Sequence, residues 1–169
     1  MEAEVDRTGP EVRVPRWVPS ASLAVCVLGL LDAAYLTFEH YTQSTTLACS
    51  ETATINCLKV TTSSYADVAG IPFAVLGVVF FLGMGLLCLP ALWRRPGRPL
   101  RLLRVAGAVV GVLVALYLVW VELFRLDAIC LYCTGVHVLT FVLFVVVALG
   151  SAATVDETLA ISQEYDGSA

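Results

Sequence analysis

Two cysteines separated by two residues, Cys130 and Cys133, stand immediately before a long apolar run. Residues 134–155 contain no Asp, Glu, Lys or Arg. In a soluble protein a CxxC pair indicates a thioredoxin-like redox centre or half of a zinc site. A dithiol at the start of a membrane helix can meet an aqueous thiol protein on one side and a lipid-soluble electron carrier on the other. The spacing therefore predicts a redox centre at a membrane surface.

The other cysteines fall into two classes by their surroundings. Cys49 and Cys57 lie in a polar, Ser- and Thr-rich segment. With Cys130 and Cys133, which stand at the edge of an apolar run, they make four cysteines, here called the polar cysteines, that can pair in three ways. Nearness in the sequence favours Cys49–Cys57 and Cys130–Cys133. The remaining two, Cys26 and Cys88, lie within apolar runs and are interpreted as small core hydrophobes.

Three roles are open for the polar cysteines. The Cys49–Cys57 bridge could equally be a structural staple. A CxxC bridge closes so short a loop that it constrains the unfolded chain very little, whereas a helix N-terminus favours the thiolate that attacks in disulfide exchange. A zinc site of four thiolates is the weaker alternative, because the eight-residue step from Cys49 to Cys57 has no ribbon-like surroundings.

Composition indicates an integral membrane protein, since 59% of the residues are hydrophobic and 14% are charged. Residues 18–38, 71–92, 102–121 and 129–150 each approach the length of about 20 that a spanning helix needs. The sequence thus predicts an all-α, four-helix membrane bundle over residues 17–152. A loop of about residues 42–69 joins the first two helices, between a polar tail (1–16) and an acidic tail (153–169). The net charge of −4 and the lack of mixed basic and aromatic residues argue against nucleic-acid binding.

Basic residues are distributed unevenly between the two predicted membrane faces. One face holds Arg7, Arg13 and Arg16 and then Arg94, Arg95, Arg98, Arg101 and Arg104. The other holds only Lys59 and Arg125. The positive-inside rule therefore predicts cytoplasmic N- and C-termini. It puts both polar cysteine pairs outside the cytoplasm, where disulfides persist.

A few polar residues near the cysteines are further candidates. Asp32 lies within the first run, and an ionisable group there is either functional or an inward-facing acid bonded to another helix. His137 follows Cys133 by four residues on one helical face, and is either a hydrogen-bonding group beside the dithiol or a core histidine. Serines at 63 and 64 predict the N-cap of a short interfacial helix over residues 65–68.

Taken together, the ordered elements resemble the vitamin K epoxide reductase family over roughly residues 18–150. The resemblance rests on Cys49-x7-Cys57, Ser63, Gly70-Ile71-Pro72 and Cys130-x2-Cys133. Residues 31–37 are also similar to the first helix of bacterial members. The family implies four helices around a quinone near the extracytoplasmic face.

The resemblance also implies a role for each cysteine. Cys133 would lie nearest the quinone, Cys130 would exchange with Cys57, and Cys49 would meet the partner protein. Ser63 matches a hydroxyl position near these cysteines. Two positions depart from vertebrate members: His137 stands where they have a quinone-bonding tyrosine, and Phe73 where they have an asparagine.

The resulting prediction is a bacterial-type, multi-pass oxidoreductase of the plasma (inner) membrane without a fused thioredoxin-like domain. It would oxidise a separate extracytoplasmic thioredoxin-fold (DsbA-like) protein and reduce menaquinone or ubiquinone, with no metal. One alternative is a vitamin K epoxide or quinone reductase that uses the same cysteines. Another is the DsbB type, although its CxxC lies in the first extracytoplasmic loop. The non-enzyme alternative is a disulfide-stapled tetraspan scaffold or transporter subunit.

Overall fold

The computed structural model describes residues 14–42, 49, 52, 54–94 and 97–166. These residues form helices α1 (Trp17–Thr42), α2 (Cys57–Thr61), α3 (Phe73–Leu87), α4 (Pro90–Trp93), α5 (Arg98–Val121) and α6 (Leu131–Asp166), the π-helical turn η1 (Glu122–Leu126), and the strands β1 (Asp67–Val68) and β2 (Ile71–Pro72). Most of the predicted N-terminal tail, with Arg7 and Arg13, lies outside the described residues, as does Arg95.

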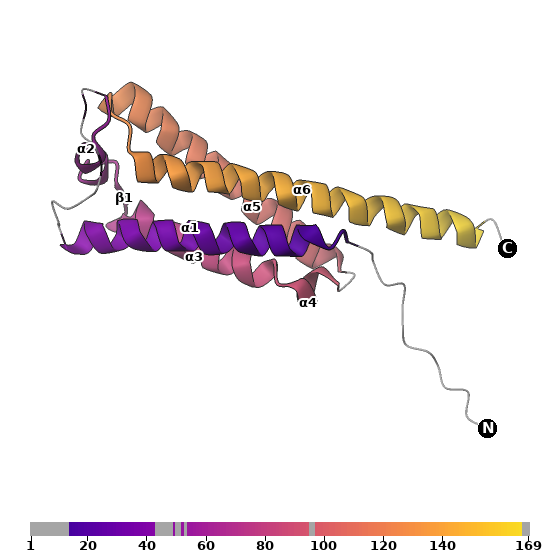
Figure 1. Cartoon of the computed structure of the whole chain (residues 1–169). Coiled ribbons are helices and arrows are strands. Elements are labelled where there is room, and N and C mark those ends of the chain that lie inside the picture. Colours follow the sequence, from indigo (N-terminus) through magenta and orange to yellow (C-terminus); the bar gives the residue numbers. More distant parts are fainter. Residues whose placement is uncertain (1–13, 43–48, 50–51, 53, 95–96, 167–169) are drawn as a thin grey trace.

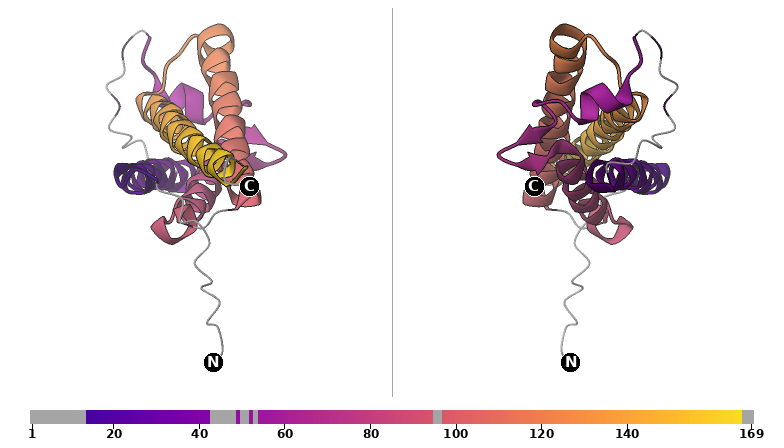
Figure 2. Two further views of the ribbon diagram at one scale, coloured as in Figure 1. Left: turned by 90° about the vertical axis from the view of Figure 1, so that its right-hand side faces the viewer. Right: turned by 90° about the vertical axis from the view of Figure 1, so that its left-hand side faces the viewer.

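The longer helices α1, α3, α5 and α6 lie roughly along a common direction, and α1 and α6 run side by side through the bundle (Figures 1 and 2). Helix α1 packs against α3 and α6, while α5 packs against α6 and, over a smaller area, α3. The beginning of α1 and the end of α6 lie at one end of the bundle, and α2 with the β-hairpin lies at the other (Figure 1). The predicted all-α class is therefore confirmed.

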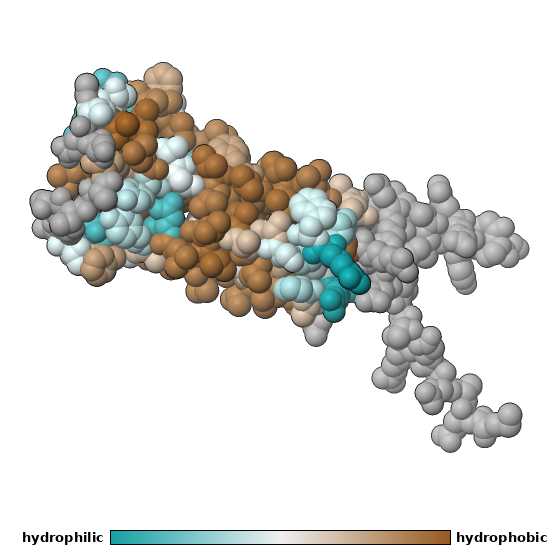
Figure 3. Space-filling model, in the orientation of Figure 1, coloured by the Kyte–Doolittle hydropathy of each residue, from teal (hydrophilic) through white to brown (hydrophobic). Residues whose placement is uncertain are grey.

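Three of the helical segments are long and apolar enough to cross a membrane: Trp17–Thr42, Arg98–Leu126 and Leu131–Ala153. Helix α3 is apolar but has 15 residues. The count of four spanning helices thus stays a prediction. Apolar side chains cover the middle of the surface, and hydrophilic ones gather toward the two ends (Figure 3).

The predicted second span, residues 71–92, has other bounds in the structure. Its first two residues form β2, and the helix ends at Leu87 before α4 begins at Pro90. Proline at a first helical position lacks only an N–H that would be unpaired there. Arg104 stabilises the break, because its Nε and Nη2 donate to the carbonyl oxygens of Leu87 and Leu92, each at 2.9 Å.

The loop before β1 also differs from its prediction. Residues 65–68 form no helix, since Asp67 and Val68 pair antiparallel with Pro72 and Ile71. Ala69 (φ 52°) and Gly70 (φ 78°) make the turn, in a left-handed conformation that glycine adopts freely. The short helix is instead α2, where the Oδ1 of Asn56 accepts the Lys59 N–H at 2.8 Å as an N-cap.

The C-terminal helix extends well beyond its predicted bounds. Residues 129–150 were expected to span, but α6 continues to Asp166. Most of the predicted acidic tail is therefore helical. The tail charges sit in the last part of a helix that begins at the CxxC motif.

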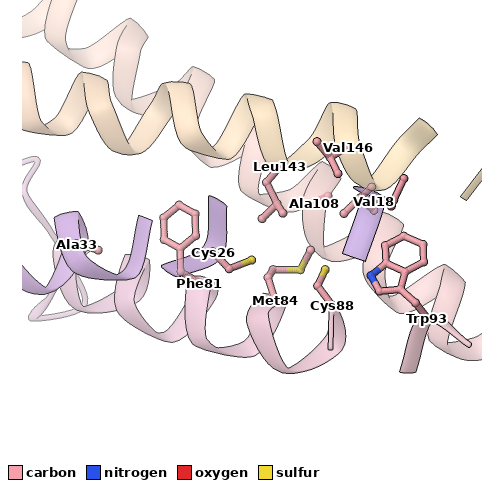
Figure 4. Packing of buried hydrophobic residues seen from close by; sticks show 11 residues of the cluster. Val18, Cys26, Ala33, Phe81, Met84, Cys88, Trp93, Ala108, Leu143 and Val146 are labelled. Atoms are coloured by element: carbon pink, nitrogen blue, oxygen red, sulfur yellow. The ribbon is translucent and has the colours of Figure 1, made fainter. Parts of the chain in front are cut away.

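Close packing in the middle of the bundle depends on small residues facing large ones. The ring of Phe81 from α3 lies against Gly29 of α1, where a side chain would overlap it. Small residues let membrane helices approach closely, and van der Waals contact then holds them. The buried cluster, drawn in Figure 4, is Val18, Cys26, Ala33, Phe81, Met84, Cys88, Trp93, Ala108, Leu143, Val146 and Val147.

Candidate active site

The structure pairs the four polar cysteines as nearness in the sequence favours. Cys49 is bonded to Cys57 with their Cα atoms 6.2 Å apart, and Cys130 to Cys133 with 5.2 Å between Cα atoms. The first disulfide joins the loop to the start of α2. The second spans the beginning of α6, so each bridge is tied to the N-terminus of a helix.

The two disulfides share one buried cluster at the hairpin end of the bundle. Cys57 and Cys130 are each 0% exposed and pack with Leu36 of α1. The segment before Cys57 is hydrogen-bonded to the residue before Cys130: Ile129 N–H donates to Thr54 O at 2.9 Å. This contact places the loop cysteines beside the helix cysteines.

Two further interactions extend this arrangement. The Asn56 N–H donates to Ile129 O at 3.1 Å, and Ile55 and Ile129 form a parallel bridge. The backbone on either side of the bridge is therefore fixed in register. Disulfide exchange needs one sulfur to attack another, and the register holds the two pairs in the same small region.

Cys130 occupies the capping position of α6. Its Sγ accepts the Cys133 N–H at 3.2 Å, the bond that a Ser or Asp side chain makes at an N-cap. A helix N-terminus also favours negative charge. The sulfur of the first CxxC cysteine therefore closes the N-terminus of α6.

A pocket lies directly beside Cys133. Its cavity volume is about 90 Å³. Its walls are mainly apolar and come from α1, α2, the hairpin, α3, α5, η1 and α6. They are Ala33, Leu36, His40, Val60, Thr61, Ser63, Tyr65, Ala66, Pro72, Phe73, Ala74, Gly77, Leu118, Val121, Glu122, Leu126, Cys133, Val136 and His137.

The pocket brings together residues that are far apart in the sequence. Ser63, Phe73, Cys133 and His137, all predicted as site residues, line it together. The His137 side chain is 5% exposed, and its Nδ1 has no hydrogen-bond partner among the described residues. A mostly apolar pocket with a few polar groups is the usual form of a small-molecule site.

Ser63 and Phe73, two of the predicted residues in the pocket wall, have defined partners. The Ser63 hydroxyl donates to Val60 O at 2.9 Å, so it closes α2 rather than capping a following helix. The Phe73 ring lies 6.4 Å from that of Tyr117, centroid to centroid. Phe73 thus lies between the pocket and the exposed Tyr117 of α5.

Asp32 does not line the pocket. It is half-buried on α1, and its carboxylate lies against Gly135 of α6, where a Cβ would come within 2.6 Å of Oδ2. Gly135 stands between Cys133 and His137 in the sequence. Asp32 therefore borders the back of the helix that carries the site.

Glu122 is a pocket residue that the sequence analysis missed. Its side chain is 5% exposed, and Oε2 accepts the Cys130 N–H at 3.3 Å. The prediction ended the third span at Val121 and did not consider Glu122. An acid next to an apolar run was the available signal, whereas Asp32 was singled out because it lies within one.

A family model described as the vitamin K epoxide reductase family matches residues 20–148. The chain belongs to the vitamin K epoxide reductase family. This family consists of membrane redox enzymes that are, in general, linked to quinones. The two disulfides and the apolar helices of this chain therefore fit a membrane thiol-disulfide oxidoreductase, as the resemblance predicted.

The residues at the pocket fit a quinone ring. The walls around Leu36, Phe73 and Val136 are apolar, as a ring and its tail require. The unpartnered Nδ1 of His137 could bond a ring oxygen. Cys133 lies in the same wall, and its sulfur can exchange electrons with such a ring.

Proposed function

We propose that this protein oxidises the dithiol of an extracytoplasmic thioredoxin-fold protein and passes the electrons to a quinone of the membrane. The observation that supports this most strongly is the sharing of one small region by both disulfides and an apolar pocket lined by Cys133. A structural staple needs no adjoining pocket, and a scaffold needs no second disulfide beside the first.

The proposed reaction begins at the loop. The partner's thiolate attacks Cys49, and the partner leaves with a new disulfide once both Cys49 and Cys57 are reduced. Cys57 then attacks Cys130, which breaks the Cys130–Cys133 bond and releases Cys133. Cys49 attacks Cys57 in turn, so that the Cys49–Cys57 bridge re-forms and Cys130 is released as the second thiol. Burial of Cys57 and Cys130 in one cluster supports this exchange, because the attacking and attacked sulfurs must meet.

The second half of the reaction takes place at the pocket. Cys133 gives two electrons to the quinone, and a disulfide between Cys130 and Cys133 re-forms. His137 would hold one ring oxygen and so orient the ring toward Cys133. Menaquinone or ubiquinone is the proposed acceptor, because the wall carries few polar groups to read a particular ring substituent.

The proposed orientation has four spanning helices in the plasma (inner) membrane. In this orientation α3 and α4 together make the second crossing, and both chain ends are cytoplasmic. Positive charge supports this: Arg16, Arg94, Arg98 and Arg101 belong to the end of the bundle opposite the hairpin. The disulfides then face the oxidising side.

One assay tests the proposal directly. Purified protein in detergent is mixed with a reduced thioredoxin-fold protein and a short-chain quinone, and quinone absorbance is followed. Thiol-dependent loss of the quinone band, with one disulfide formed in the partner per quinone consumed, is the expected result. Absence of any thiol-dependent reduction with several partners and with dithiothreitol would overturn the proposal.

A pair of variants gives the assay its internal control. With Cys57→Ala, dithiothreitol still reduces Cys130–Cys133 directly and quinone reduction continues, whereas the protein partner becomes ineffective. With Cys133→Ala neither donor supports quinone reduction. Equal loss with both donors in the Cys57 variant would contradict the relay order.

A further inference from the structure

The buried carboxyl of Glu122 lies between the reactive disulfide and the pocket. Its Oε2 accepts the Cys130 N–H at 3.3 Å, and the side chain also forms part of the pocket wall with Cys133. Glu122 thus contacts a cysteine of the proposed reaction and also borders the cavity that would hold the acceptor. An acid with only a capping role would need the first contact alone.

The chain conformation aims this side chain inward. Glu122 begins the π-helical turn η1, which adds a residue to the turn and changes the direction of the side chains relative to α5. The Glu122 carbonyl accepts the Ala128 N–H at 3.2 Å, and Asp127 ends the turn in a left-handed conformation (φ 46°). Turns of this kind occur often at functional sites.

The Glu122 carboxyl lacks a cationic partner in the part of the chain that the structure describes, where no Lys or Arg forms an ion pair with it. A buried charge without a partner is costly, and such groups respond by taking up or releasing a proton. The other titratable or charged groups around the site are His40 from α1, Tyr65 from the loop, Cys133 and His137 from α6, exposed Lys59 from α2, and exposed Arg125 and Asp127 from its own turn.

We propose that Glu122 transfers a proton from the Cys130 thiol to the quinone during oxidation of the Cys130–Cys133 dithiol. This inference rests on the proposed function. Two S–H bonds break and one S–S bond forms, which releases two electrons and two protons. The quinone takes both electrons and both protons to become a quinol. One proton comes from Cys133, and the other leaves Cys130 through the Glu122 carboxylate.

The pocket itself makes such a group necessary. Its walls are mainly apolar, so few groups there can accept a proton. His137 faces the pocket from α6, but in the proposed function its free nitrogen holds a ring oxygen. Glu122 is the carboxyl among the wall residues, and it contacts the backbone of the cysteine whose proton has to leave.

The variant Glu122→Gln distinguishes a role in proton transfer from a role in holding the Cys130 backbone. The amide oxygen of glutamine still accepts the Cys130 N–H, so a purely supporting role predicts full activity. Proton transfer predicts a fall in kcat of about 100-fold, within the range for a lost general acid or base. KM for the quinone should change little, because the wall keeps its shape. The assay uses full-length protein, dithiothreitol and a short-chain quinone.

A matched control and a rescue complete the experiment. Asp127→Asn removes the same charge from an exposed carboxyl of the same turn, and asparagine tolerates its left-handed backbone; its kcat should equal that of the wild type. Glu122→Ala should be slow but should recover with added formate, a small carboxylate that can enter the vacated space. Glu122→Asp should keep part of the activity.

Each outcome decides one question. Wild-type kcat in Glu122→Gln, or no response of Glu122→Ala to formate, overturns the proton-transfer proposal and leaves the proposed function intact. A wild-type protein that reduces no quinone overturns both. If Glu122→Gln does not fold, as judged by gel filtration in detergent, the formate response of Glu122→Ala and the activity of Glu122→Asp decide instead.

Discussion

The bundle buries two pairs of sulfurs, one toward each end, and their surroundings differ sharply. Toward the chain ends, Cys26 and Cys88 are 2% and 0% exposed and within hydrogen-bond reach of each other, packed with Met84 (Figure 4). At the hairpin end, Cys57 and Cys130 are as deeply buried. Burial therefore does not distinguish disulfide-bonded from free sulfur in this protein.

The two pairs differ in the groups that surround them. The hairpin-end cysteines have disulfide partners, a helix cap and a pocket wall beside them. The pair toward the chain ends is free and surrounded by side chains that pack. In the proposed function, access for a partner and an acceptor decides which sulfur reacts.

The largest difference is expected from removing sulfur at each end. Cys133→Ser should abolish thiol-dependent quinone reduction, because no disulfide can form at the pocket. Cys26→Ala together with Cys88→Ala should leave kcat unchanged, although the lost packing should reduce stability by about 1–2 kcal/mol per site. Quinone absorbance and thermal unfolding in detergent measure the two effects. A strong loss of kcat in the double variant would remove the contrast.

The packed core should control stability without controlling chemistry. Phe81→Ala removes a ring that is 1% exposed and should cost about 3–5 kcal/mol of unfolding free energy. Turnover per folded molecule should stay the same, since Phe81 lies outside the pocket wall. Denaturant titration followed by activity of the remaining folded fraction provides the check. Unchanged stability with reduced turnover would reverse the roles of the two regions.

A smaller effect is expected at the pocket histidine. His137→Phe keeps the ring volume but removes Nδ1, and one hydrogen bond of about 1.4 kcal/mol corresponds to a tenfold rise in KM for quinone. Thr140→Val is the matched control: Thr140 is also buried on α6, but its hydroxyl bonds Val136 O and it does not line the pocket. An equal rise in KM for both variants would argue against a quinone contact.

The smallest effect concerns the contact of α1 with α6 behind the site. In Gly135→Ala the new Cβ would meet Asp32 Oδ2 at 2.6 Å, so the carboxyl must move, at a cost of about 1 kcal/mol. Asp32→Ala in the same chain should restore the loss. A double-mutant cycle on unfolding free energy measures the coupling, and purely additive effects would mean that the two groups do not press on each other.

Hydropathy predicted the helical regions because a spanning helix must be apolar along its length. It could not predict where the second run breaks, since Pro90 and the bonds from Arg104 act locally and across the bundle. Serine caps predicted a helix at residues 65–68, but the left-handed turn at Ala69 and Gly70 allowed strand pairing instead. The helix in this loop formed where Asn56 supplied a cap.

The cysteine pairing followed from spacing alone, because partners eight and three residues apart are hard to separate in space. The pocket wall was predicted only through Ser63, Phe73, Cys133 and His137. Glu122 was not predicted as a wall residue because a hydropathy pattern does not reveal a π-helical turn. Without that turn, the residue after an apolar run is expected to face water rather than Cys130.

The parallel bridge between Ile55 and Ile129 has a kinetic consequence. It ties the loop sulfurs to the helix sulfurs within one chain, so the proposed exchange between them would proceed at a high effective molarity that no dilution lowers. In the proposed reaction the step with the partner protein is bimolecular, so its rate falls when both proteins are diluted. At low partner concentration, electron flow should therefore be first order in partner, and the internal transfer should never limit the rate.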